Sequence, residues 1–76
     1  MFEVQNQGGN WIEYRTKIER VDRTRYLVHM VLEGVVPEDY FDGRPCRIDG
    51  DVCQSVRTKE SKLRSHDTVV VLSVRL

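Results

Sequence analysis

The stretch Tyr26-Leu27-Val28-His29-Met30-Val31-Leu32 decides the fold class of this chain. Successive side chains of a β-strand point to opposite faces, and in this stretch the residues of both faces are mainly apolar. A strand with one face in water alternates apolar and polar residues instead. The stretch is therefore expected to be a strand covered on both sides, by this chain curled round, by a second copy, or by a partner.

The chain has 76 residues, which corresponds to a single small β domain over residues 1–76. A domain of this size buries only ~60% of the surface that its unfolded chain exposes, so disulfides, a metal or oligomerisation commonly supplement its stability. Twelve basic residues balance twelve acidic ones, for a formal net charge of +0. This balance argues against a generic polyanion binder but leaves room for a local basic patch.

Clean alternation from Trp11 to Val21 predicts a single strand that pairs with the opening stretch. A three-residue loop at Asp22-Arg23-Thr24 gives the pair one continuous apolar face, so this register is preferred. The expected cross-strand pairs are Ile18 with Val28, Thr16 with Met30, and Tyr14 with Leu32. On the other face, Leu27, His29 and Val31 are left beside charged residues of the neighbouring strand.

The remaining segments predict an all-β antiparallel fold, either a small barrel or a strongly curled sheet of five to six strands. Further strands are expected at residues 2–6, 46–48, 52–58 and 68–76, with a loop at 59–66. The last strand is again apolar on both faces. Pro37 followed by acidic residues, with Gly43 as a stop, predicts one short helical turn near 37–42. Tyr40 or Phe41 is expected to turn inward as a plug.

Cys46 and Cys53 flank a turn signal, and two registers are open for it. A three-residue loop at Asp49-Gly50-Asp51 sets Ile48 opposite Val52 and turns the two cysteines to opposite faces, where they cannot bond. A two-residue loop at Asp49-Gly50 sets Cys46 directly opposite Cys53 but breaks the apolar face. The first register and two free thiols are favoured.

Two groups of residues resemble reactive sites without meeting their requirements. Ser65-His66-Asp67 holds the residue types of a hydrolase triad, but a triad needs convergence in space rather than adjacency. Asp49-Gly50-Asp51 lacks the spacing of a calcium loop, and the cysteine spacing is not that of a zinc site. The chain is therefore expected to be no enzyme and to carry no metal or cofactor.

The residues Met1–Gln5 have neither the basic lead nor the apolar core of a secretory signal. The longest apolar run, Val69–Leu72, is far shorter than the ~20 residues of a membrane span. A cytoplasmic protein that does not enter membranes is expected.

The function favoured by these patterns is a non-enzymatic protein-binding module, acting by occupying the surface of a partner. A small subunit, adaptor or inhibitor, such as phages and mobile elements encode, belongs to this class. Homo-oligomerisation, most simply as a dimer, is also expected, and it would bury Leu27 and Val31 and extend to Val69 and Val71. The residues predicted to bind a protein partner are Trp11, Arg15, Leu27, His29 and Val31.

The alternative is a nucleic-acid-binding small β-barrel that contacts phosphates through a basic loop at 57–64. The residues that would do so are Arg57, Lys59, Lys62 and Arg64. Single-strand binders also need aromatic stacking platforms on the same surface, and here the aromatic residues do not interleave with the basic ones. A small-molecule site at the mouth of a barrel is the least favoured function, because a barrel this small offers little room.

Overall fold

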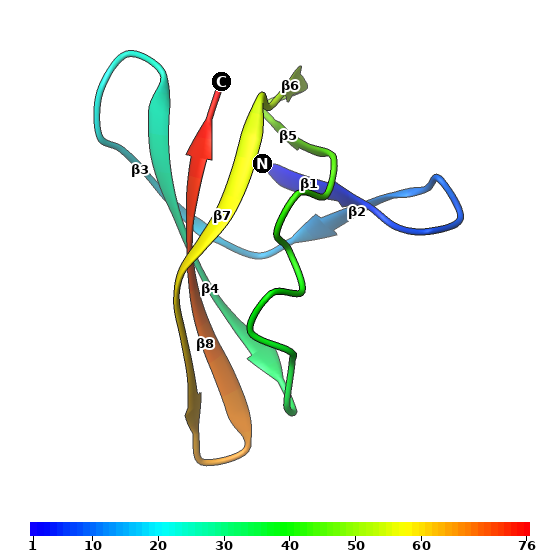
Figure 1. Cartoon of the computed structure of the whole chain (residues 1–76), viewed down its shortest axis with the longest axis vertical. Helices are drawn as coiled ribbons and strands as arrows, with labels where there is room; N and C mark the ends of the chain where they lie inside the picture. The colour runs from blue at the N-terminus through cyan, green and yellow to red at the C-terminus, as the bar shows by residue number, and fades with distance from the viewer.

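A computed structural model describes all residues 1–76, and it confirms the all-β antiparallel fold (Figure 1). The eight strands are β1 (Phe2–Gln5), β2 (Trp11–Tyr14), β3 (Lys17–Arg20), β4 (Arg25–Glu33), β5 (Cys46–Ile48), β6 (Asp51–Val52), β7 (Ser55–Arg64) and β8 (Asp67–Arg75). They form two four-stranded sheets, a smaller one in the order β2-β1-β5-β6 and a larger one in the order β3-β4-β8-β7. The finer prediction, a small barrel or one strongly curled sheet of five to six strands, is not confirmed, because eight strands are divided between two sheets that do not close into a barrel.

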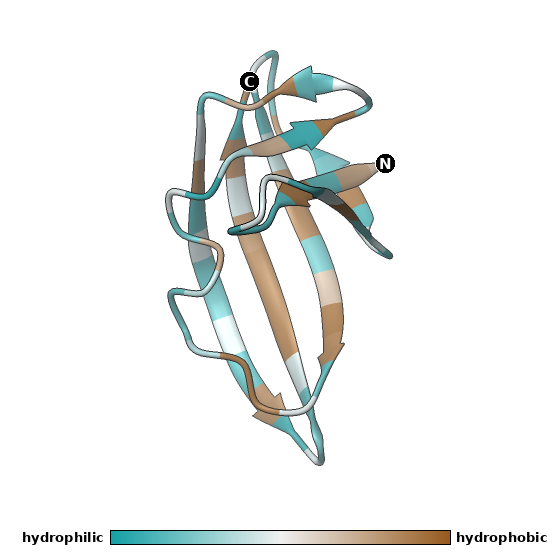
Figure 2. Cartoon of the chain, turned by 90° about the vertical axis from the view of Figure 1, so that its right-hand side faces the viewer, coloured by the Kyte–Doolittle hydropathy of each residue, from teal (hydrophilic) through white to brown (hydrophobic).

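The two sheets form two layers, with the smaller sheet lying crosswise over one end of the larger (Figure 2). Apolar residues of both inner faces fill the space between them, together with Phe41 from the connection between β4 and β5. The largest fully buried side chains are Phe2, Phe41, Leu72, Val28, Val74 and Cys46.

The segment from Trp11 to Val21 is two strands rather than the predicted one. β2 pairs with β1 in the smaller sheet, whereas β3 pairs with β4 in the larger sheet. The chain passes from one layer to the other at Arg15 and Thr16. The pair Ile18–Val28 and the three-residue loop are confirmed, but Tyr14 lies opposite Phe2 instead of Leu32. Alternation alone cannot distinguish one long strand from two that share a face.

The connection from Gly34 to Pro45 contains hydrogen-bonded turns and no helix, so the predicted helical turn at 37–42 is not confirmed. Its N–H groups bond to carbonyls three residues earlier, from Tyr40 to Pro37 and from Asp42 to Asp39. The predicted inward plug is confirmed, since Phe41 is 1% exposed. This one large apolar residue fixes the connection against the core.

The predicted loop at 59–66 is mostly strand, because β7 runs without interruption to Arg64 except for a bulge between Thr58 and Glu60. A two-residue turn at Ser65-His66 then leads into β8, with Ser65 at a φ of 56°. β7 is an edge strand, and charged side chains on an edge strand remain in water. The polar composition of this segment therefore does not prevent it from pairing with the apolar β8.

The favoured register of the β5–β6 hairpin is also wrong. Arg47 lies opposite Val52 and Ile48 opposite Asp51, which leaves the two-residue loop Asp49-Gly50. Both loop residues have positive φ, 50° and 87°, as a type I′ turn requires. The preference of Asp-Gly for this turn outweighs the apolar face, and Val52 is left 68% exposed.

Candidate functional site

The larger sheet turns one face away from the core, and we call this the outer face. Residues next to the buried Val28 on β4 and Leu72 on β8 point outward, because side chains alternate along each strand. Across the two strands, the outward residues pair as Leu27 with Ser73, His29 with Val71, and Val31 with Val69. The core and the smaller sheet lie on the opposite side (Figure 2).

Four apolar side chains run down the middle of the outer face. They are Leu27, Val31, Val69 and Val71, and we call them the apolar strip. Val31 is 62% exposed, and the other three are half-buried. Single exposed apolar residues are ordinary on protein surfaces, but adjacent ones on the two central strands of a sheet form a continuous patch. The strip is therefore a surface that another molecule can cover.

A shallow hollow of about 370 Å³ adjoins the apolar strip. Arg15 lines it from the corner between the two sheets, His29 and Val31 line it from β4, and Val69 lines it from β8. The structure thus brings together three of the residues predicted to bind a partner. Leu27 lies on the same outer face, two residues from His29 along β4.

His29 is held by a carboxylate of the neighbouring strand. Its Nε2 atom lies 3.3 Å from Oε1 of Glu19, and its cross-strand neighbour on β3 is Lys17. Both side chains of the His29–Glu19 pair are more than a third exposed. Charged and polar groups therefore border the apolar strip on the β3 side, an arrangement of apolar centre and polar rim that protein interfaces share.

Trp11 lies on the outside of the smaller sheet, on the other side of the molecule from the apolar strip. The guanidinium of Arg47 stacks over its ring at 3.9 Å, and the same guanidinium bonds to Glu3 at 3.0 Å. These three residues come from β2, β5 and β1. The structure therefore does not bring Trp11 together with Leu27, His29 and Val31.

The four basic residues of the nucleic-acid alternative lie on β7 rather than in a loop. Register sets Arg57, Lys62 and Arg64 opposite outward residues of β8, so these three share the outer face with the apolar strip. Lys59 lies in the bulge. The ammonium of Lys62 pairs with Glu60 at 2.7 Å, so its charge is partly balanced within β7.

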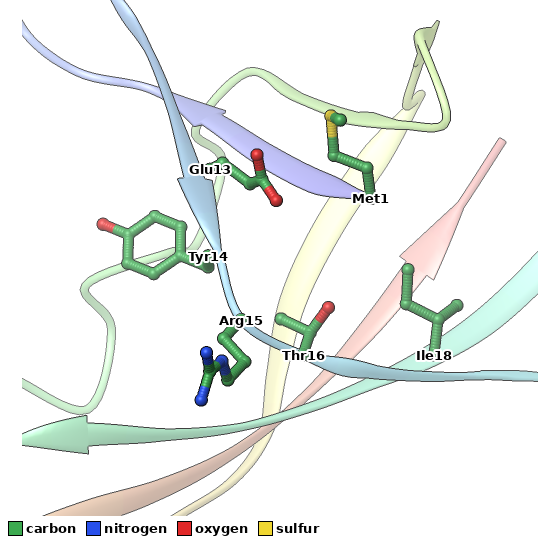
Figure 3. Close-up of a pocket in the computed structure, with 6 residues that line it drawn as sticks. All are labelled: Met1, Glu13, Tyr14, Arg15, Thr16 and Ile18. Carbon is green, nitrogen blue, oxygen red and sulfur yellow. The ribbon is translucent and has the colours of Figure 1, made fainter.

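A second hollow, of about 600 Å³, lies where β2 passes into β3 (Figure 3). Met1, Glu13, Thr16 and Ile18 line it, together with Tyr14 and Arg15. Burial raises the pKa of the Tyr14 hydroxyl, and the neighbouring Tyr40 raises it further. The lining holds one carboxylate, that of Glu13, and no histidine or cysteine.

Four charged residues at the ends of the outer face were missed from the sequence. They are Arg25, Glu33, Asp67 and Arg75. A signal for them exists, since every second residue of β4 reads Arg25, Leu27, His29, Val31, Glu33. Recognising it requires the exact ends of the strand, and strand ends are the least certain part of a prediction from sequence.

No three His, Cys, Asp or Glu side chains gather closely enough to hold a metal ion. The chain forms no helix with the length and apolar character needed to cross a bilayer. Comparison of the chain with models of protein families, with curated proteins and with solved structures finds no match in any of the three.

Proposed function

We propose that this chain is a non-enzymatic protein-binding module, acting as a small subunit, adaptor or inhibitor through the outer face of its larger sheet. The apolar strip is the observation that carries the proposal. It stands on β4 and β8, which pair over nine residues each and form the centre of the sheet. A surface on two central strands is rigid, so little conformational entropy is lost when a partner covers it.

The surroundings of the strip support the same function. The strip is bordered on the β3 side by Arg15, Lys17 and the His29–Glu19 pair. On the β7 side it is bordered by Arg57 and Lys62. Arginine is enriched at protein interfaces because its guanidinium combines apolar contact with directed hydrogen bonds. We place the function in the cytoplasm, since both cysteines are free thiols, as is usual in a reducing compartment.

Affinity capture with matched variants tests the proposal. Val31→Glu places a charge in the apolar strip, whereas Val35→Glu places the same charge on the connection, at a valine that is 81% exposed. Proteins retained by the wild type and by Val35→Glu, but lost with Val31→Glu, are the expected result. Equal recovery by all three proteins, or no specific recovery by the wild type, would contradict the proposal. Circular dichroism establishes that each variant is folded.

Nucleic-acid binding stays the second candidate, because Arg57, Lys62 and Arg64 share the outer face. Binding by these residues would weaken steeply with salt, as counterions are displaced from phosphates. It would also be lost in the double variant Arg57→Glu/Lys62→Glu. A single-stranded oligonucleotide that shows no binding at low salt would eliminate this candidate. The aromatic rings needed for base stacking are not on this face, since Trp11 and Tyr40 are each stacked by an arginine elsewhere.

A further inference from the structure

The outward residues of the two central strands carry opposite charges at their two ends. Along β4 they run from Arg25 through Leu27, His29 and Val31 to Glu33, and along β8 from Asp67 through Val69, Val71 and Ser73 to Arg75. The strands are antiparallel, so Arg25 lies directly opposite Arg75, and Glu33 directly opposite Asp67. On these two strands one end of the strip therefore carries two positive charges and the other end two negative charges, the negative end being partly offset by Arg64, which lies opposite Asp67 on β7.

This arrangement is unfavourable within one molecule, because like charges directly opposite each other destabilise a sheet. Arg25 is balanced by Asp22 at 2.6 Å. Arg75, Glu33 and Asp67 form no ion pair within the chain. Three of the four end charges are thus available to an external partner.

The positive end also forms a hollow. Arg25, Arg57 and Arg75 line it together with Ser55 and Ser73, around a volume of about 440 Å³. All five side chains can donate hydrogen bonds, and no carboxylate lines the hollow. Arginine and hydroxyl groups in this arrangement suit a carboxylate or another anion. The lining of this hollow is an observation separate from the pairing of β4 with β8. It also indicates a negatively charged occupant.

We infer that the outer face packs against the same face of a second copy, related by a two-fold axis that runs across the strands at the His29–Val71 pair. Arg25 and Glu33 each lie four positions from His29, and Arg75 and Asp67 each lie four positions from Val71. Rotation about this axis therefore brings Glu33 and Asp67 of the second copy over Arg25 and Arg75 of the first.

The same rotation places the apolar residues in contact. Leu27 and Val31 lie two positions on either side of His29, so Leu27 of each copy meets Val31 of the other. Val71 meets its own copy at the axis, and Val69 meets Ser73. Such a contact is isologous, with each residue pair made twice. The second copy thereby covers the apolar strip. This contact accounts for a strand, β4, that is apolar on both of its faces.

The charges at the strand ends favour this axis over a two-fold axis parallel to the strands, which would also stack the two faces. An axis parallel to the strands would place the positive ends of both copies against each other and the two negative ends against each other. Rotation about the axis across the strands stacks β7 on β7 of the second copy and sets Arg57 against Lys62, and a crossing of the two packed sheets by about 30° separates these like charges at the sheet edge. The charges of the two central strands therefore decide the orientation. The inference deepens the proposed function, on which it rests, by naming the partner.

Sedimentation equilibrium with charge-reversal variants tests the inference. We expect the wild type to be a dimer at high micromolar concentration, and Arg75→Glu and Asp67→Arg each to weaken association on the order of tenfold or more. Arg23→Glu and Glu38→Arg make the same charge changes on the turn after β3 and on the connection, and they should leave the dimer unchanged. Circular dichroism checks the folding of each variant.

Restoring association with complementary variants distinguishes loss of the proposed contact from damage to the fold of the variant. When Arg75→Glu and Asp67→Arg chains are mixed, one contact becomes Glu against Arg and the other keeps the wild-type pair, so a heterodimer should form. The double variant Arg75→Glu/Asp67→Arg should likewise dimerise. A monomeric wild type, a dimer insensitive to both single variants, or a mixture that fails to associate would each overturn the inference. A monomeric wild type that captures another protein, with loss in Val31→Glu, would overturn the dimer and leave the proposed function standing.

Discussion

Cys46 lies directly opposite Cys53 in the β5–β6 hairpin, and the N–H of Cys53 donates to the carbonyl of Cys46 at 2.8 Å. The neighbouring Cys53 thiol raises the pKa of Cys46, and burial raises it further. The neighbouring Cys46 thiol in turn lowers the pKa of Cys53. Cys46 is part of the core, whereas Cys53 is partly exposed. The hairpin therefore pairs a protected thiol with a more acidic, accessible one.

Treatment with oxidised glutathione should close a disulfide between these residues. The Cys53 thiolate attacks the glutathione disulfide and releases one glutathione thiol, after which Cys46 displaces the second and gives up its proton. The Cα atoms of directly opposed residues are about 5.5 Å apart, within the range that a disulfide spans. Intact mass should show the loss of two hydrogens, and the unfolded protein should no longer be alkylated. Closure of this short loop should stabilise the fold by roughly 2 kcal/mol.

Cys46→Ser is the control for this chemistry. It leaves Cys53 without a resolving thiol, so the variant should stop at a mixed disulfide with glutathione. Two alkylated cysteines in the treated wild-type protein, or two mixed disulfides, would contradict the predicted closure.

Phe41→Ala should destabilise the fold by about 3–5 kcal/mol, because it removes the side chain that closes the core on the side of the connection. The Phe41 ring packs edge to face against Tyr14 at 5.4 Å and against Tyr40 at 5.0 Å. Urea unfolding followed by circular dichroism measures the loss. Tyr40→Ala should cost clearly less, since Tyr40 is 37% exposed. Equal losses would mean that Phe41 does not hold the connection.

Asp42→Ala should lower the unfolding free energy by about 1 kcal/mol, as expected for lost hydrogen bonds near the surface. Its Oδ1 atom accepts hydrogen bonds from the backbone N–H of Thr58 at 2.6 Å and from the hydroxyl of Thr58 at 2.7 Å. These bonds attach the connection to β7. Asp39→Ala is the matched control, because no side-chain hydrogen bond of Asp39 is present, and it should leave the urea midpoint unchanged.

The stability of the fold should depend on the protonation of Asp22 at low pH. The N–H of Thr24 and the side chain of Arg25 bond to its carboxylate and lower its pKa from 3.8 to about 2. A carboxyl group whose pKa is lower in the folded state stabilises the fold at pH values above its unfolded pKa. This stabilisation is lost as the pH falls through the folded-state pKa. The melting temperature of the wild type should therefore exceed that of Asp22→Asn above pH 4, with a gap that narrows toward pH 2. A gap that stays constant over this range would contradict the prediction.

Trp11→Ala should reduce stability without affecting association through the outer face. Its ring lies under Arg47 on the other side of the molecule, and a cation–π contact contributes about 0.5–1 kcal/mol. Thermal melting measures the first effect and sedimentation the second. Dissociation of the dimer by Trp11→Ala at unchanged folding would mean that the smaller sheet takes part in the interface.

Local pattern was enough to predict much of the fold. Period-two alternation identified most of the strands, the Asp22-Arg23-Thr24 loop set Ile18 opposite Val28, and Tyr40 or Phe41 was expected to turn inward as a plug, which Phe41 does. The outward set Leu27, His29 and Val31 was likewise visible, because a strand with no polar side must present apolar residues on both faces. These features depend on neighbours in sequence, so the sequence alone determined them.

Tertiary structure decided the rest. The break at Arg15 and Thr16, where one alternating segment divides between two sheets, depends on which layer each half can cover. The polar segment of β7 becomes a strand because β8 offers it a partner, and the turn at Asp49-Gly50 overrides the apolar match of Ile48 with Val52. The alignment of Arg25 with Arg75 and of Glu33 with Asp67 likewise requires the ladder between β4 and β8. Composition sets which residues are apolar or charged, but pairing between distant strands decides which of them share a face.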